Sequence, residues 1–195
     1  MRKVLQFKVS LLNITPPIWR KIQISDLCTF WSLHVAIQDA MGWLDEHLHE
    51  FSLESPYNKK EIRMGIPFED DIEEINPEAG WYFKVAPFLE RNKSFLYIYD
   101  FGDNWRHKVE FEGAYDKVPD IKYPCCIGGE RKCPPENVGS FSGYERLVKA
   151  MKNKKSPDYI RYIRWLGKHY DPEDFDCKKV KFSRANYRLN KLLED

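Results

Sequence analysis

The segment from residue 95 to residue 111 constrains the fold more than any other part of the chain. Two runs in which apolar and aromatic residues alternate with polar ones are joined by Gly102, Asp103 and Asn104. Gly and Asn tolerate the positive φ angles of tight turns, and a period of two gives each strand one apolar face. We therefore predict a β-hairpin at the centre of a sheet. In the expected register Phe101 faces Trp105, and Asp100 faces Arg106 on the polar side. The apolar face would then carry Phe95, Tyr97, Tyr99, Phe101, Trp105, His107, Val109 and Phe111.

The residues before this hairpin predict further strands and one helix. Alternation over 4–12 and 18–24, separated by Pro16 and Pro17, predicts a first hairpin. Asp26 or Thr29 can cap a helix that stops at Gly42, which gives a β-β-α opening. A strand is expected to present His47, His49, Phe51 and Leu53 on one face. Short strands at 62–66 and 81–85, a turn or helix at 87–91 and an acidic loop or surface helix at 69–78 complete this part.

The residues after the hairpin read as a loop followed by helices. Residues 116–143 are rich in Pro, Gly and Cys, which favours an ordered loop. Ser142 and Ser156 can each cap a helix, and the segment 171–177 is expected to lead into a last helix toward Leu193.

A chain that runs from mostly β to mostly α predicts an α+β fold. We expect a mixed, mostly antiparallel sheet with C-terminal helices packed on it. The expected organisation is one domain over residues 1–195, with a β-rich part at 1–115, the loop at 116–143 and a helical part at 144–195.

Net charge, the length of apolar stretches and the cysteine count indicate where the protein is located and which partners it has. The net charge is +1, and no stretch of about 18 apolar residues occurs. These features predict a soluble, cytoplasmic protein with no membrane partner. The five cysteines, an odd number, favour reduced thiols over a disulfide framework.

Five motifs, in order along the chain, resemble one known family. They are Pro-Pro-Ile-Trp-Arg at 16–20, Met-Gly-Trp at 41–43 with His-Leu-His-Glu-Phe at 47–51, Tyr-Asp-Phe-Gly-Asp-x-Trp-x-His at 99–107, Cys-x-x-Gly-x-x-x-x-Cys-Pro-Pro-Glu at 126–136 with Gly-Tyr at 143–144, and Asp-Pro-Glu-x-Phe at 171–175. They resemble the plasmid pRiA ORF-three-like family, also labelled TnpR-like transposon passenger proteins. The resemblance implies a single α+β domain and a mobile-element context, and it implies no activity. Ser-Phe-Ser at 140–142 and a tail lengthened over 181–186 depart from the family pattern.

Three histidines are the first candidate site. His47, His49 and His107 fall on strands expected in one sheet, and neutral imidazole binds Zn, Fe, Ni or Cu. Additional ligands would come from Asp100, Cys126 or Cys133, so one transition-metal ion is the alternative cofactor. The competing interpretation is that these histidines are buried residues with hydrogen-bonded ring nitrogens.

The metal hypothesis has a catalytic form. In that form the chain is a metal-dependent hydrolase or nuclease, and the general base is Asp100, Asp103 or Glu136.

The C-terminal region suggests a second alternative. Residues 146–195 hold fourteen Lys and Arg and seven Asp and Glu, interleaved with aromatic residues. Cations that neutralise phosphates beside aromatics that stack on bases are typical of nucleic-acid surfaces. Charged faces of ordinary amphipathic helices give the same pattern, so nucleic acid is a candidate partner only.

The leading hypothesis is a soluble, non-catalytic binding module. Its ligand-facing surface would combine the strand at 47–51, the turn at 99–107 and the loop at 126–136. The candidate residues for contact with a ligand are Trp19, Arg20, Trp43, Tyr99, Trp105 and Arg106.

Overall fold

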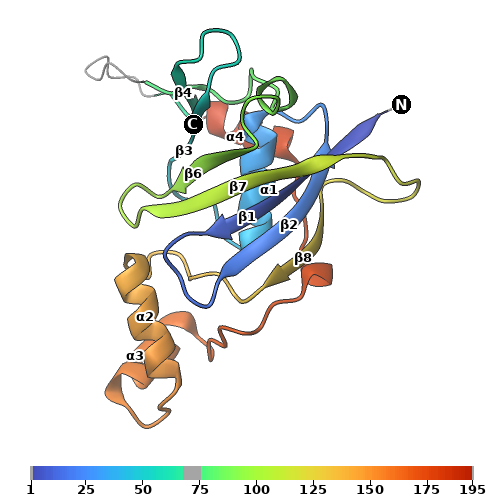
Figure 1. The fold of residues 1–195 in the computed structure, drawn as a ribbon. Helices are drawn as coiled ribbons and strands as arrows, with labels where there is room; N and C mark the ends of the chain where they lie inside the picture. Colours follow the sequence, from blue (N-terminus) through green and yellow to red (C-terminus); the bar gives the residue numbers. More distant parts are fainter. Residues whose placement is uncertain (1, 68–75, 195) are drawn as a thin grey trace.

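The computed structural model describes residues 2–67 and 76–194. Within these residues eight strands form one sheet in the order β5-β4-β3-β6-β7-β1-β2-β8, and the only parallel pair there is β4 with β5 (Figure 1). The strands are β1 Lys3–Leu11, β2 Ile18–Ser25, β3 His49–Glu54, β4 Glu61–Gly65, β5 Glu78–Ala79, β6 Ser94–Tyr99, β7 Trp105–Asp116 and β8 Cys125–Glu130. The predicted α+β class with a mixed, mostly antiparallel sheet is confirmed.

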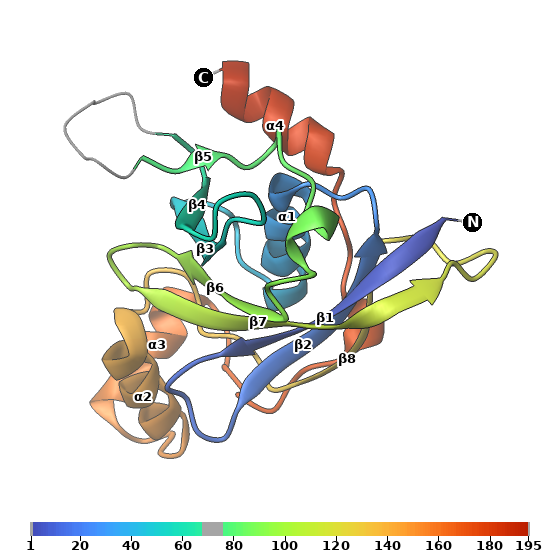
Figure 2. The same cartoon turned by 45° about the horizontal axis from the view of Figure 1, so that its top comes forward.

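Across residues 2–67 and 76–194, four α-helices and two short 3-10 helices accompany the sheet. They are α1 Phe30–Met41, η1 Ala86–Phe88, α2 Ser140–Met151, α3 Pro157–Leu166, η2 Cys177–Lys179 and α4 Ala185–Glu194. Figure 2 shows α1 lying over one face of the sheet, α4 lying over α1, and the pair α2 and α3 beside one end of the sheet. The last helix therefore packs on a helix rather than directly on the strands. No helix within the described residues is long and apolar enough to cross a membrane.

The central hairpin forms as predicted, with its pairing shifted by two residues. Tyr99 pairs with Trp105 and Tyr97 with His107, so five residues form the turn. Asp100 and Asn104 take positive φ angles of 57° and 54°, which widens the turn beyond the predicted three residues. Because the shift is even, the predicted faces are kept, except that Phe101 is 44% exposed in the turn. Arg106 pairs with Ile98 and not with Asp100.

The β-β-α opening is confirmed. β1 and β2 pair as antiparallel neighbours, and their buried residues alternate along both strands. The Thr29 side chain accepts the Ser32 N–H at the start of α1, and Gly42 ends the helix with a φ of 87°. Phe30 of this helix packs against Phe51, Phe88 and Phe95 with ring centroids 5.2 to 6.3 Å apart. The core thus lies between α1 and the sheet.

Several predicted elements differ from the structure. Strand β3 starts at His49, so His47 precedes it. Residues 81–85 form turns with a single bridge between Thr29 and Lys84 and not a strand.

The differences continue toward the C-terminus. The predicted loop 116–143 contains strand β8, which pairs with β2 at the edge of the sheet. Helix α2 starts at Ser140, two residues before the predicted Ser142 cap, and α4 starts only at Ala185. The acidic segment 69–78 lies largely outside the described residues.

Candidate functional site

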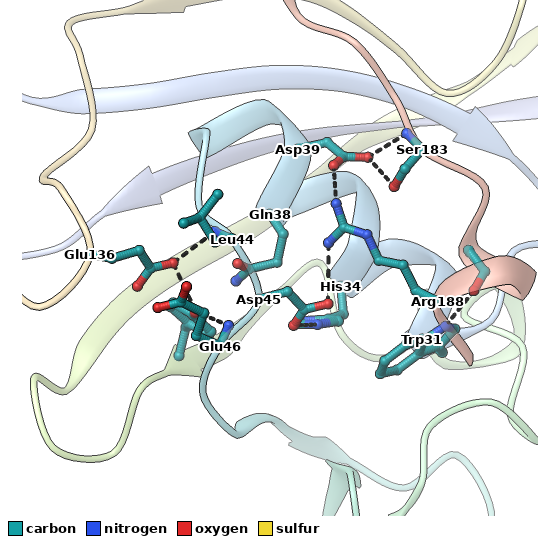
Figure 3. A network of polar contacts seen from close by, with 12 residues as sticks. Trp31, His34, Gln38, Asp39, Leu44, Asp45, Glu46, Glu136, Ser183 and Arg188 are labelled. Atoms are coloured by element: carbon teal, nitrogen blue, oxygen red, sulfur yellow. Dashed lines mark hydrogen bonds and ion pairs between the residues drawn. The ribbon is translucent and has the colours of Figure 1, made fainter. Parts of the chain in front are cut away.

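A buried network of polar side chains links α1 to α4. His34 donates or accepts at both ring nitrogens, with Nε2 2.7 Å from Asp45 Oδ1 and Nδ1 2.9 Å from the Tyr97 hydroxyl. The Gln38 amide donates to the same hydroxyl over 2.8 Å. Arg188 of α4 bridges Asp45 and Asp39, as Figure 3 shows. This network fixes the segment after α1 and the last helix to each other.

The order of these groups is the order of a catalytic relay. A carboxylate, an imidazole and a hydroxyl in sequence can move a proton to or from a substrate. However, His34 and Tyr97 are both 0% exposed, so no substrate reaches the hydroxyl in this structure. The arrangement therefore braces the fold.

The neighbouring groups of this network set the protonation states of Asp45 and Tyr97. Burial alone would raise the pKa of the Asp45 carboxyl, but the hydrogen bonds and charges of His34 and Arg188 outweigh it and lower that pKa. Burial raises the pKa of Tyr97 well above its ordinary value, so its hydroxyl stays protonated. The ion pair between Asp45 and Arg188 is therefore present throughout the neutral range.

Sequence reasoning missed His34, Gln38 and Asp45 as a group. His34 and Gln38 lie four residues apart within an otherwise apolar helical stripe, and that spacing puts both on the buried face. Two polar residues at this spacing on a core face are the signal that could have indicated a buried network.

The three segments of the predicted ligand surface do meet. Glu136 Oε1 accepts the Tyr99 hydroxyl at 2.9 Å and the Leu44 N–H at 2.8 Å. His47 Nε2 lies 3.0 Å from the Asn137 amide oxygen and 3.6 Å from Asp100. The loop after α1, the hairpin turn and the loop after β8 thus form one cluster at one end of the sheet.

The three candidate bases brace these loops. Asp100 accepts the N–H groups of Gly102 and Asp103, which closes the hairpin turn. Asp103 in turn accepts the Gly139 N–H at 3.2 Å. Burial raises the pKa of the Glu136 carboxyl, although its two donors partly offset this. Each carboxylate therefore has a structural role in the loop cluster, and catalysis by Asp100, Asp103 or Glu136 stays a hypothesis.

Most of the predicted ligand contacts are core residues. Trp43, Tyr99 and Trp105 are at most 3% exposed, and Trp43 stacks on Tyr99 with ring centroids 5.1 Å apart. Arg20 is 1% exposed and donates to three backbone carbonyls. These four side chains are buried in the core in this structure, and their contact with a ligand stays a prediction. Trp19 is half-buried and Arg106 is exposed.

The five candidate metal ligands do not share a centre. His49 stacks on His34, whereas His107 lies edge-on to Trp43 and is separated from β3 by strand β6. Cys126 Sγ lies 3.3 Å from the Gly128 carbonyl oxygen, and Cys133 is buried. In the part of the chain that the structure describes, no three His, Cys, Asp or Glu side chains are arranged to hold a metal ion. The predicted cluster of His47, His49, His107, Cys126 and Cys133 is thus not formed.

A large hollow lies elsewhere, at the β8 edge of the sheet. We call it the basic groove. It is lined by residues 2–4, 25, 117, 121–126, 177, 178, 180 and 182–186, and its volume is about 1070 Å³. Figure 2 shows how the segment that leads to α4 leaves the β8 edge and rises to α1.

The lining of the basic groove has one sign of charge. Among the described residues that line it there is no carboxylate, and six are cationic: Arg2, Lys3, Lys117, Lys122, Lys178 and Arg184. Lys3 pairs with Asp116 at 2.7 Å, and no carboxylate of the described residues lies within ion-pair distance of the other five. Two of the six cations belong to the basic C-terminal region noted in the sequence, whereas α2 and α3 take no part.

Comparison with known proteins finds a family model, a relative and a solved structure that are similar to this chain. The model of the plasmid pRiA4b ORF-3-like protein family matches residues 3–179. The uncharacterized protein y4hQ of Sinorhizobium fredii is 28% identical over 198 residues, covering 98% of this chain and 91% of that protein. A crystal structure of a protein of unknown function, MM3350 from Methanosarcina mazei Go1, is 39% identical with a TM-score of 0.84, and the match covers 93% of this chain and 99% of that one. None of these descriptions gives an activity.

Proposed function

This chain belongs to the plasmid pRiA4b ORF-3-like protein family, and we propose that it is a non-catalytic binding module that takes a nucleic-acid strand in the basic groove. The observation that carries the proposal is the lining of the basic groove, which among the described residues holds six cations and no carboxylate. The whole chain carries a net charge of only +1, so this concentration of positive charge is local. A local cationic concavity attracts polyanions even when the net charge does not.

The shape of the hollow favours a polymer over a small anion. A neighbouring hollow of about 420 Å³ shares Arg2, Lys117 and Ile121 with the basic groove. Another hollow of about 250 Å³, on the side of α1, shares Tyr123 and Ser183 with it. The three hollows are therefore neighbours along this edge, and although Asp116 and Asp120 line the smaller one beside Lys117, their combined length suits an extended chain of phosphates.

Two aromatic side chains in the lining fit the same ligand. Tyr123 and Phe182 are half-buried and line the groove, one from the segment before β8 and one from the segment before α4. Aromatic rings beside phosphate-binding cations provide stacking surfaces for bases in single strands. We therefore expect single-stranded nucleic acid to bind more tightly than duplex of the same length.

The test is fluorescence anisotropy with labelled 20-nucleotide single strands of DNA and RNA and with the matching duplex. Five cations are free to contact phosphates, so the slope of log K against log salt is expected to approach about −3.5 for a single strand. Lys122→Gln should weaken binding and make this slope shallower by about 0.7. The matched control is Lys155→Gln, which removes an exposed cation between α2 and α3 and should leave binding unchanged.

Two results would contradict the proposal. Binding that is absent or insensitive to salt would exclude a phosphate-binding groove. An equal loss of affinity in Lys122→Gln and Lys155→Gln would assign the effect to general charge and not to the groove.

A further inference from the structure

One wall of the basic groove is a segment with few attachments. Residues 180–184, which we call the strap, link η2 to α4 and belong to no helix or strand. Phe182, Ser183 and Arg184 of the strap line the groove. No residue of α4, which follows the strap, is buried. Val180 and Phe182 pack against the hydrophobic core, so Ser183 and Arg184 are the part of this wall whose position depends on a small number of polar contacts.

Asp39 of α1 makes most of these contacts. Its Oδ2 accepts the Ser183 N–H at 2.7 Å and the Ser183 hydroxyl at 2.9 Å. Its Oδ1 accepts an N–H of the Arg188 guanidinium. The Asp39 side chain is 7% exposed and points from α1 toward the strap (Figure 3). One carboxylate thus holds both the strap and the first turn of α4.

Two further contacts fasten the start of α4. Arg188 also reaches Asp45 Oδ2 at 3.1 Å, and the Trp31 indole N–H donates to the Ala185 carbonyl at 2.9 Å. Neither contact engages the strap itself, which leaves Asp39 as the side chain that fixes Ser183.

We propose that Asp39 is a positioning residue for the basic groove, because it holds the strap so that Arg184 and Phe182 face the bound strand. This inference rests on the proposed nucleic-acid function for its ligand. Asp39 does not line the groove, so it acts through Ser183 and Arg188.

Charge and positioning predict opposite outcomes when Asp39 is neutralised. Asp39 is a negative charge beside a site for a polyanion, so its loss by itself would strengthen binding. Loss of the strap contacts would instead displace Arg184 and weaken binding. The sign of the change separates the two explanations.

The experiment compares Asp39→Asn with Asp158→Asn in the full chain. Asp158 lies on α3 with a side chain that is 66% exposed, and its substitution removes the same charge away from the groove. Asp39→Asn should raise the Kd for a labelled single-stranded 20-mer at least about 5-fold, whereas Asp158→Asn should leave it within about 2-fold. Circular dichroism establishes that each variant is folded. Ser183→Ala, a surface change that removes only one of the three contacts, should show a smaller loss in the same direction.

Trypsin cleavage gives a readout that needs no ligand. Lys181 and Arg184 lie in the strap, so Asp39→Asn should speed cleavage after these residues several-fold relative to wild type and to Asp158→Asn. Unchanged cleavage, or a Kd equal to or lower than that of wild type, would overturn the role of Asp39. If wild type itself binds no oligonucleotide, the proposed function fails, and the cleavage rates still decide whether Asp39 holds the strap.

Discussion

His34 and His49 stack with parallel imidazole rings, their centroids 3.4 Å and their planes 7° apart. His34 comes from α1 and His49 from the first residue of β3, and both are at most 2% exposed. Burial, and secondly the charge of His34, lower the pKa of His49 well below its ordinary value. Two positively charged rings in this buried stack would repel each other, so we expect the contact between α1 and β3 to weaken in acid.

The first prediction concerns stability against pH. Burial lowers the pKa of His107 to about 3, from an ordinary value of 6.5. Below pH 6.5 the unfolded chain binds a proton at this residue that the folded chain does not, so the free energy of unfolding falls as the pH is lowered. Each such histidine contributes a slope of up to about 1.4 kcal/mol per pH unit. Urea unfolding between pH 7 and pH 4.5 measures this slope.

Substitution can separate the contributions of His49 and His107 to this slope. His107→Gln should lower the slope of the unfolding free energy against pH by up to about 1.4 kcal/mol per pH unit, the contribution of one proton. This change in slope is separate from any effect of the substitution on stability at pH 7. His169 is exposed, and His169→Gln serves as the matched control. A slope that is the same in all three proteins would mean that His107 is protonated in the folded state.

The second prediction concerns Arg20, which is buried without a carboxylate partner among the described residues. Its guanidinium donates to the carbonyls of Trp19, Ala40 and Glu130 over 2.8 to 2.9 Å and lies 3.5 Å from the centre of the Phe175 ring. A lysine ammonium cannot reach three carbonyls in this planar arrangement. Arg20→Lys should therefore lower the free energy of unfolding by about 3 kcal/mol.

A urea midpoint measured for Arg20→Lys and Phe175→Leu checks this role. Phe175→Leu keeps the three hydrogen bonds and loses only the stacked ring, so its loss should be smaller, about 1 kcal/mol. If Arg20→Lys is as stable as wild type, Arg20 does not join β2, β8 and α1 as the geometry indicates.

Alternation of apolar and polar residues predicted most of the sheet. Strands β1, β2, β6 and β7 have one buried face, and that face is visible in the sequence. Strand β8 was predicted as loop because Cys125–Glu130 contains adjacent Cys and Gly residues with no alternation. Its conformation comes from pairing with β2, which is a tertiary contact.

The candidate site was less predictable for the same physical reason. The motifs of the family resemblance indicated that the loops around His47, Tyr99 and Glu136 share one surface. The burial of the aromatic residues beside them comes from tertiary packing, which no local pattern reveals. The basic groove combines segments near residues 2, 122 and 184, which no local pattern connects. Asp39 and Arg188, which pair beside this groove, lie 149 residues apart in the sequence.

The third prediction concerns the start of α2. A Cβ atom on Gly143 would lie 1.9 Å from the Val138 carbonyl oxygen, which is backbone and cannot move aside. Gly143→Ala should therefore unwind the first turn of α2 and cost about 3 kcal/mol or more. Gly42→Ala is the matched control, because a Cβ there meets no atom within 4 Å and only the φ of 87° opposes it. That strain costs about 1 kcal/mol, and equal losses in thermal unfolding would contradict the predicted clash.

The fourth prediction uses the cysteines as a footprint of the groove. Cys28 and Cys133 are each 5% exposed, and burial raises the pKa of both thiols to about 12, so N-ethylmaleimide should not label them in the folded protein at pH 7. Cys125, Cys126 and Cys177 are half-buried and all three line the basic groove. Mass spectrometry should therefore find at most three labels in the folded chain and five in urea.

A saturating single-stranded oligonucleotide should slow the labelling of Cys125, Cys126 and Cys177. The hollow that holds them also holds the six cations, so labelling at an unchanged rate while the oligonucleotide is bound would place the nucleic acid on another surface.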